Sequence, residues 1–152
     1  MLMRILTLGC ALLAATAVAI PAEQETFTFH PQQSVYIVAV RGNLGDPSLS
    51  TLDLSTEKKI RDGFTKRAVF NIAPSLSKAD FVFLCITEYR NERVLQHALA
   101  LALRPSDFQA NRSDLIKLRD LALWQTTKSS RAGAALKLKT VVDDFHTFVA
   151  KP

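Results

Sequence analysis

The three histidines, His30, His97 and His146, are the residues of this sequence best suited to metal binding or proton transfer. They lie far apart, and none has a histidine four residues away or a cysteine nearby, which is the spacing that zinc sites use. The sequence has no Gly-x-Ser-x-Gly turn and no Ser-x-x-Lys accompanied by its partner motifs. These patterns predict neither a metal site nor a set of catalytic residues.

The sequence contains one segment that could be a phosphate loop and one pair of neighbouring carboxylates. The segment 42–45, Gly-Asn-Leu-Gly, faintly resembles a phosphate loop, but it lacks both the Gly-Lys-Ser/Thr ending and the third glycine of a dinucleotide turn. Asp143 and Asp144 are adjacent on an expected helix, so their side chains point about 100° apart. We therefore expect a plain loop, surface carboxylates and no cofactor.

The positive charge is concentrated in the C-terminal part of the chain. Residues 23–103 carry nine Lys or Arg and nine Asp or Glu, whereas residues 104–152 carry nine Lys or Arg and five Asp. A basic surface suits an anionic partner, although a solvated helix face would have the same composition. Nucleic acid is not expected, because no Lys/Arg run is interleaved with aromatic residues.

Two regions are candidate contact surfaces for a partner, together with an edge strand of the sheet. One is the loop 41–53, which is rich in turn-forming residues, and the other is the basic face of the C-terminal part. The candidate binding residues are Arg41, Asn43, Asp46, Lys128, Arg131, Lys137 and Lys139.

The N-terminus has the pattern of a bacterial secretory signal, which we place at residues 1–22. Arg4 precedes 16 uncharged residues, 5–20, which are fewer than the ~20 that a membrane span needs. The small-x-small segment 17–19 predicts cleavage after Ala19 or Ala22, which would leave no stable transmembrane anchor. The expected location is the periplasm or the exterior of a bacterium.

Downstream of the signal, we expect a flexible segment 23–33 and a single α/β domain at 34–152. The mature chain would have about 130 residues, a normal length for one domain. It retains one cysteine, Cys85, which lies in the apolar run 81–86 and is expected to be a buried, inert thiol. Trp124 is expected to be an anchor in the core or at its rim.

Hydrophobic patterning gives the expected elements. Apolar runs predict strands at 35–40, 69–73, 81–87 and 121–127, and residues spaced by four predict helices at 55–68, 113–119 and 131–150. Asp53 or Ser55 would cap the first helix, and Ser113 the second. The segment 94–103 contains Ala and Leu in strict alternation, so both helix and strand fit it; its short distance from the previous strand favours strand.

The resulting order is typical of an α/β (α+β) fold in two layers. We expect one mixed, mainly antiparallel sheet with the helices packed on one face.

The segment 77–83, Ser-Lys-Ala-Asp-Phe-Val-Phe, resembles the start of a strand in small periplasmic envelope domains of the TolB amino-terminal, LpoB and CsgG type. The resemblance covers about residues 34–150 and implies a non-catalytic binding or assembly module, without assigning any site residue. The chain departs from the lipoprotein members of this group, because Thr7 stands where a lipoprotein signal has Leu before its cysteine, here Cys10.

These observations favour an exported, non-catalytic accessory or binding domain of the bacterial cell envelope. Its partner would be an envelope protein or an anionic envelope polymer. Two alternatives remain open: a small exported hydrolase with an unfamiliar site near His97, Arg104 and Asp107, and a carrier of a small ligand between sheet and helices.

Overall fold

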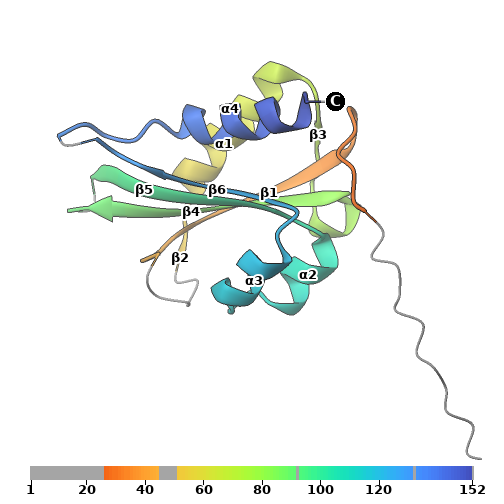
Figure 1. Ribbon diagram of the computed structural model, residues 1–152, viewed down its shortest axis with the longest axis horizontal. Helices are drawn as coiled ribbons and strands as arrows, with labels where there is room; N and C mark the ends of the chain where they lie inside the picture. The colour runs from red at the N-terminus through yellow and green to blue at the C-terminus, as the bar shows by residue number, and fades with distance from the viewer. Residues whose placement is uncertain (1–25, 45–50, 92, 132, 152) are drawn as a thin grey trace, which may run out of the picture.

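The computed structural model of the protein describes residues 26–44, 51–91, 93–131 and 133–151 (Figure 1). The expected signal at 1–22 and the candidate residue Asp46 lie outside these ranges. In chain order the elements are β1 (Ser34–Arg41), β2 (Thr51–Leu52), α1 (Leu54–Arg67), β3 (Asn71–Ile72), a 3₁₀ turn (Leu76–Lys78), β4 (Phe81–Arg90), β5 (Val94–Leu103), α2 (Pro105–Ala110), α3 (Leu115–Leu121), β6 (Trp124–Ser129) and α4 (Leu138–Val149).

The strands form one mixed sheet in the order β2-β1-β4-β5-β6, and β3 pairs with the start of β1. β1 runs parallel to β3 and β4, whereas the β1–β2, β4–β5 and β5–β6 pairs are antiparallel. α1 forms the crossover between the two parallel strands β1 and β4, which a hairpin cannot join. The predicted α/β class with a mixed, mainly antiparallel sheet is confirmed.

The prediction that the helices pack on one face is wrong, because they cover both faces (Figure 1). α1 and α4 lie over one face, where Phe83 belongs to the core, and α2 and α3 lie under the other, where Leu84 belongs to a second core. β4 and β5 are apolar on both sides, and a strand buried on both faces needs a covering layer on each.

The ambiguous segment 94–103 is the strand β5, as the short distance from β4 favoured. Its alternation places Ala98, Ala100 and Ala102 in the core beneath α1 and α4, and Leu99 and Leu101 in the core above α2 and α3. Small residues on the first side let the helices approach the sheet closely.

Three predicted boundaries were wrong. α4 begins at Leu138 rather than 131, because the preceding segment runs along the sheet and the Leu136 amide donates to the Leu95 carbonyl at 2.9 Å. α3 begins after Asp114, whose side chain accepts from the Lys117 amide, so Ser113 is not its cap. β6 begins at Trp124, because residues up to 121 belong to α3.

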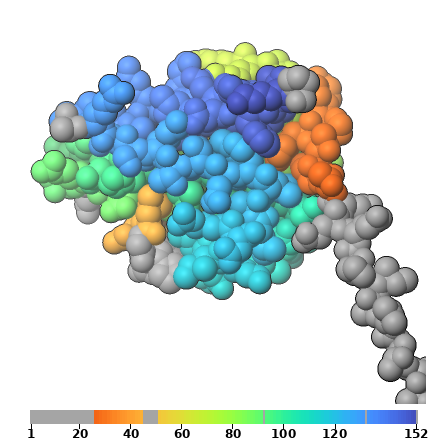
Figure 2. All heavy atoms as spheres, viewed as in Figure 1, coloured from red at the N-terminus to blue at the C-terminus, as the bar shows by residue number. Residues whose placement is uncertain are grey.

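The N-terminal segment that we expected to be flexible is packed on the domain where it is described. Phe27 and Phe29 contact the core under α4, and the Phe29 ring lies 5.1 Å from Phe81 and 5.2 Å from Phe145. In the space-filling view the orange N-terminal residues lie against the blue C-terminal helix (Figure 2). Aromatic edge-to-face packing therefore joins the two ends of the described chain.

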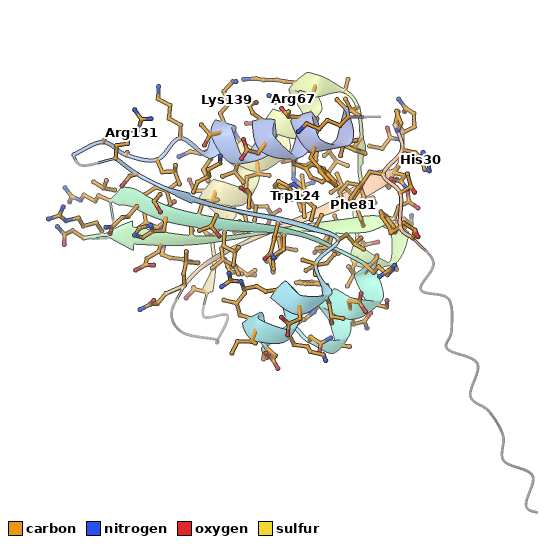
Figure 3. The ribbon with its side chains drawn as sticks, in the orientation of Figure 1. His30, Arg67, Phe81, Trp124, Arg131 and Lys139 are labelled. Carbon is orange, nitrogen blue, oxygen red and sulfur yellow. The ribbon has the colours of Figure 1, made fainter. Side chains whose placement is uncertain are left out.

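Trp124 contributes to the same core. Its ring is stacked at 6.1 Å on Phe83 and lies edge-on at 5.0 Å to Phe145. It is half-buried at the edge strand β6, as expected of an anchor at the rim of the core. Figure 3 shows it between the sheet and α4.

Candidate functional site

A hollow of about 510 Å³ lies between α1, the end of the β4–β5 hairpin and the segment that leads into α4. We call it the basic groove. Its lining residues are Lys59, Asp62, Gly63, Lys66, Arg67, Tyr89, Arg93, Leu95, Ala135, Leu136, Lys137, Leu138, Lys139 and Val142.

The walls of the basic groove come from segments far apart in the sequence. Lys59, Gly63 and Lys66 lie on one face of α1, since residues three and four apart share a helix face. Lys137 and Lys139 form the opposite wall at the start of α4. Figure 3 shows the labelled Lys139 and Arg67 close to each other at this end of the two helices.

The floor of the groove is apolar. Leu95 and Val142 are buried beneath it, and Leu136 and Leu138 are half-buried at its side. Gly63 permits this arrangement: a Cβ atom there would lie 3.4 Å from Cγ1 of Val142. The two helices are therefore in close contact at Gly63.

The charge on the lining is strongly positive, with six basic side chains and one acidic one. Asp143, just outside the lining, forms ion pairs with Arg67 and, at 2.6 Å, with Lys139. In the part of the chain that the structure describes, the other four basic residues make no ion pair; they are Lys59, Lys66, Arg93 and Lys137. Among the described residues, Asp62 is the one carboxylate in the lining, and it pairs with Lys58 rather than with any of these four.

The start of α4 adds to this positive character. No side chain caps its N-terminus, its first turn has no acidic residue, and the capping position is occupied by Lys137. The backbone N–H groups at a helix start carry partial positive charge and favour anions. The wall formed at the start of α4 therefore has the partial positive charge of a helix N-terminus in addition to the lysine ammonium groups.

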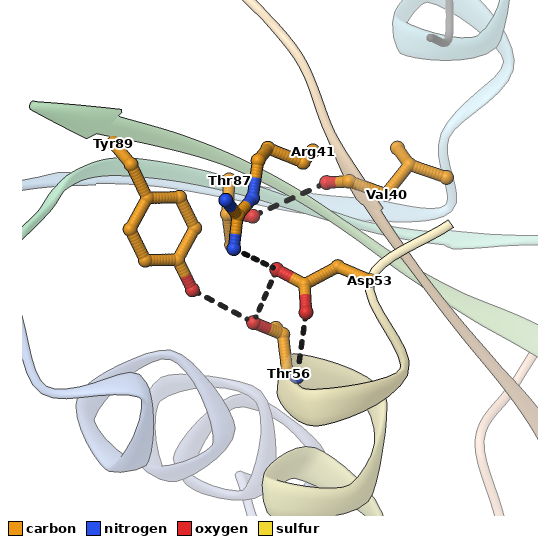
Figure 4. Close-up of polar contacts among 6 residues, drawn as sticks. All are labelled: Val40, Arg41, Asp53, Thr56, Thr87 and Tyr89. Carbon is orange, nitrogen blue, oxygen red and sulfur yellow. Dashed lines mark hydrogen bonds and ion pairs between the residues drawn. The ribbon is translucent and has the colours of Figure 1, made fainter. Parts of the chain in front are cut away.

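A polar network fixes the opposite end of the groove, at the start of α1 (Figure 4). The Asp53 carboxylate accepts hydrogen bonds from the Thr56 amide at 3.0 Å and the Thr56 hydroxyl at 2.9 Å. The Tyr89 hydroxyl lies 3.0 Å from that Thr56 hydroxyl and donates to it, because the Thr56 proton is directed at the carboxylate. Tyr89, which lines the groove, is thereby tied to the cap of α1.

Arg41 completes this network. Its guanidinium lies 3.6 Å from the Asp53 carboxylate and 4.2 Å from the centre of the Tyr89 ring, a cation–π contact. Burial alone would raise the pKa of Asp53, but the hydrogen bonds from Thr56 and the charge of Arg41 together lower that pKa below its ordinary value. Asp53 is therefore an ionised structural cap.

The structure places only two of the residues predicted for binding, Lys137 and Lys139, in the basic groove. Lys128 on β6 is paired with Asp144 at 2.5 Å, and Arg131 lines a separate hollow at the tip of the β4–β5 hairpin. Figure 3 shows Arg131 on the loop between β6 and α4, apart from Lys139 on α4. The expected basic face is thus divided among different surfaces.

The predicted loop 41–53 is not part of the groove lining. Arg41 belongs to the network around Asp53, Asn43 is exposed beyond the end of β1, and Asp46 lies outside the described residues. The loop contains the short strand β2, which was not predicted because two residues are too few to show an alternating pattern.

Sequence reasoning missed four groove residues: Lys59, Lys66, Arg67 and Arg93. The first three lie outside the buried stripe of α1 formed by Thr56, Ile60 and Phe64, on what would be the solvent side of an isolated helix. Only the approach of residues 135–139 turns that side into a wall. The sequence feature that could have indicated this approach is Gly63, since a small residue within a helix often marks a close packing contact.

The residues proposed for a hydrolase site do not converge. His97 lies near the start of β5, whereas Arg104 and Asp107 follow its end, and a rise of about 3.3 Å per residue separates them by roughly 20 Å. His97 Nδ1 lies 2.8 Å from the Ser129 hydroxyl across the β5–β6 pair. This pair is exposed, and none of the described hollows includes it.

Other groups of catalytic type are isolated. Burial raises the pKa of the Cys85 thiol to about 12, so the nucleophilic thiolate is absent at neutral pH, as expected of an inert core cysteine. Within the described ranges, no three His, Cys, Asp or Glu residues are arranged to hold a metal ion. The helices that the structure describes are all too short or too polar to cross a membrane.

Comparison with known proteins gave no match: no family model, no curated protein and no solved structure is similar to this chain. No relative therefore assigns a function to any of its residues. The basis for a functional assignment is the geometry and charge of the basic groove.

Proposed function

We propose that this protein is an exported, non-catalytic binding domain of the bacterial cell envelope that holds an anionic partner in its basic groove. The observation that carries the proposal is a set of four basic side chains that line one concave surface and form no ion pair with any described residue: Lys59, Lys66, Arg93 and Lys137. The N-terminal signal pattern and the likeness of the segment 77–83 to envelope domains support the same role.

The physical reason is electrostatic focusing. Like charges gathered around a hollow repel one another, which disfavours the empty state, and a cleft lined by one sign of charge raises the local concentration of oppositely charged ligands. Dissolved salt screens the attraction between the groove and its ligand, with a screening length of about 10 Å at an ionic strength of 0.1 M. Binding by the groove should therefore weaken as salt is added.

The proposal is tested by capture from envelope extract. Mature protein, residues 23–152, is immobilised, and the retained material is identified by mass spectrometry and by phosphate and sugar analysis. Capture of one anionic component at low salt, and its release at high salt, is the expected result. No specific capture at low salt would contradict the proposal.

Matched variants locate the capture on the molecule. Lys66→Glu with Lys137→Glu reverses two charges in the groove and should abolish retention. Lys117→Glu with Arg119→Glu makes the same change in net charge on exposed positions of α3, on the opposite face of the sheet, and should leave retention unchanged. Equal loss in both pairs would show that only net charge matters and would overturn the assignment to the groove.

A further inference from the structure

We infer that the ligand of the basic groove is a single anionic amphiphile, with its phosphate among the lysines and its acyl chain on the apolar floor. The inference rests on the proposed function and deepens it by naming the chemical class of the ligand. It follows from the combination, in one cavity, of a cationic rim and a floor built from leucine and valine.

The floor is the feature that distinguishes an amphiphile from a simple anion or a sugar polymer. Leu136 and Leu138, both half-buried, offer aliphatic surface along the groove above the buried Leu95 and Val142, and a free phosphate would leave that surface in water. Lysine side chains add to it, since their methylene stems lie along apolar surface while the ammonium group stays in solvent. An acyl chain removes this surface from water, which favours binding.

The head of the ligand would lie where the two walls meet at the start of α4. Lys66 on α1 and Lys137 on the opposite wall supply ammonium groups, and the uncapped N-terminus of the twelve-residue helix α4 supplies backbone N–H donors. Asp143 holds Arg67 and Lys139 in place, so these two cations shape the groove while retaining their own carboxylate partner.

The size of the groove favours one small ligand over a protein surface. Its volume of about 510 Å³ lies within the range of about 300–1,000 Å³ that is common for small-molecule pockets. A stable protein interface covers roughly 800 Å² on each partner and is usually much flatter than this concave hollow.

Three soluble probes test the inference by isothermal titration calorimetry on the mature protein, with the two decyl compounds kept below their critical micelle concentrations. Decyl phosphate carries both the charge and the chain, inorganic phosphate carries the charge alone, and decyl maltoside carries the chain alone. We expect decyl phosphate to bind at least about tenfold more tightly than either of the others. Amide chemical shifts should then change at Gly63 and Leu138 and stay constant at Lys117.

Two variants separate the contributions of head and chain. Lys66→Glu should lower the affinity for decyl phosphate and for inorganic phosphate alike, by about tenfold or more, because both ligands are held by their charge. Leu136→Asn, at a half-buried position, should lower the affinity for decyl phosphate and leave the affinity for inorganic phosphate unchanged. Circular dichroism of each variant confirms that it is folded, and Lys117→Glu serves as the control for charge reversal away from the groove.

The outcomes distinguish this inference from the proposed function. Equal affinity for decyl phosphate and inorganic phosphate would overturn the amphiphile and keep an anion site. Equal affinity for decyl maltoside and decyl phosphate would also overturn it, because charge would then contribute nothing. If no probe binds while envelope capture still depends on Lys66 and Lys137, the amphiphile is overturned and the binding domain stands; if capture fails as well, both are overturned.

Discussion

Gly63 in α1 lies directly against Val142 in α4, so that a Cβ atom added at Gly63 would meet Cγ1 of Val142 at 3.4 Å. This separation is the closest ordinary van der Waals contact, and it sets how near the two helices can be. The same contact forms the floor of the basic groove. Gly63 is therefore the position at which helix packing and groove shape can be changed together.

Gly63→Ala should raise the free energy of unfolding by about 0.5 kcal/mol, because alanine favours the helix over glycine by about 0.5–1 kcal/mol and its methyl group just fits. Gly63→Ile adds atoms that collide with Val142 and should lower the free energy by about 1–3 kcal/mol. Urea denaturation of both variants measures the difference. A stabilised Gly63→Ile protein would show that the helices separate freely.

The hydrogen-bonded cap at Asp53 should contribute measurably to stability. Asp53→Ala removes the acceptor for the Thr56 amide and should cost about 1 kcal/mol, up to about 2 because the cap is buried. Asp114→Ala at the exposed cap of α3 is the comparison and should cost less. Thermal unfolding of the two variants measures which of them loses more stability.

The depressed pKa of Asp53 predicts the sign of the pH dependence. A carboxyl group with a folded pKa below its unfolded value of 3.8 contributes stability above pH 3.8, and this contribution is lost as pH falls from 3.8 through the folded pKa. Asp53→Asn should therefore show a shallower loss of stability in this window than the wild type. Identical pH profiles would show that Asp53 has its ordinary pKa in the fold.

His146 should make the protein less stable in mild acid. Burial lowers its pKa below 6.5, and the charge of Arg67 acts in the same direction, while the hydrogen bond to the Val142 carbonyl, 2.9 Å away, opposes them. The unfolded state then binds more protons between the folded pKa and 6.5, so stability is complete above pH 6.5 and falls as pH is lowered through that window.

Replacement of His146 tests that account. His146→Phe keeps an aromatic ring among Phe64, Phe70 and Phe145, and it should flatten the stability profile below pH 6.5. His30→Gln, at an exposed position, is the control and should leave the slope unchanged. A slope that persists in His146→Phe would assign the effect to another group.

The alanine face of β5 predicts a strict size limit. Ala100 is fully buried in the core that β5 shares with α1 and α4, so Ala100→Leu should cost about 1–3 kcal/mol by overpacking. Thr127→Leu on the neighbouring strand β6 introduces the same side chain at an exposed position and should change stability by less than about 0.5 kcal/mol. Chemical denaturation compares the two variants directly.

The elements that were predicted well are those whose local pattern and tertiary environment agree. β4 and the apolar stripe of α1, with Ile60 and Phe64, follow from periodicity alone, because these residues are buried in the core as the pattern requires. For 94–103, local propensity was divided between helix and strand, and pairing with β4 decided for strand.

The errors arise where a distant segment changes the role of a residue. Lys59 and Lys66 are on the solvent side of α1, and they line a groove only because residues 135–139 run beside that helix. The late start of α4 has the same cause, since the Leu136 amide is bound to the sheet. The second helical layer was missed because α2 is too short to show periodicity, and because the pattern that predicts a helix at 113–119 does not say which face of the sheet that helix covers.

The aromatic contacts of Phe29 bring the beginning and the end of the described chain together, with ring centres 5.2 Å from Phe145 and 6.2 Å from Phe148. Adjacent ends are the arrangement that tolerates circular permutation. A short linker from α4 to the segment before β1, with new termini opened at the β4–β5 turn near Asn91, would preserve every layer of the fold. Such a permuted chain would carry its new ends beside the basic groove, where a fused reporter would sense an occupant.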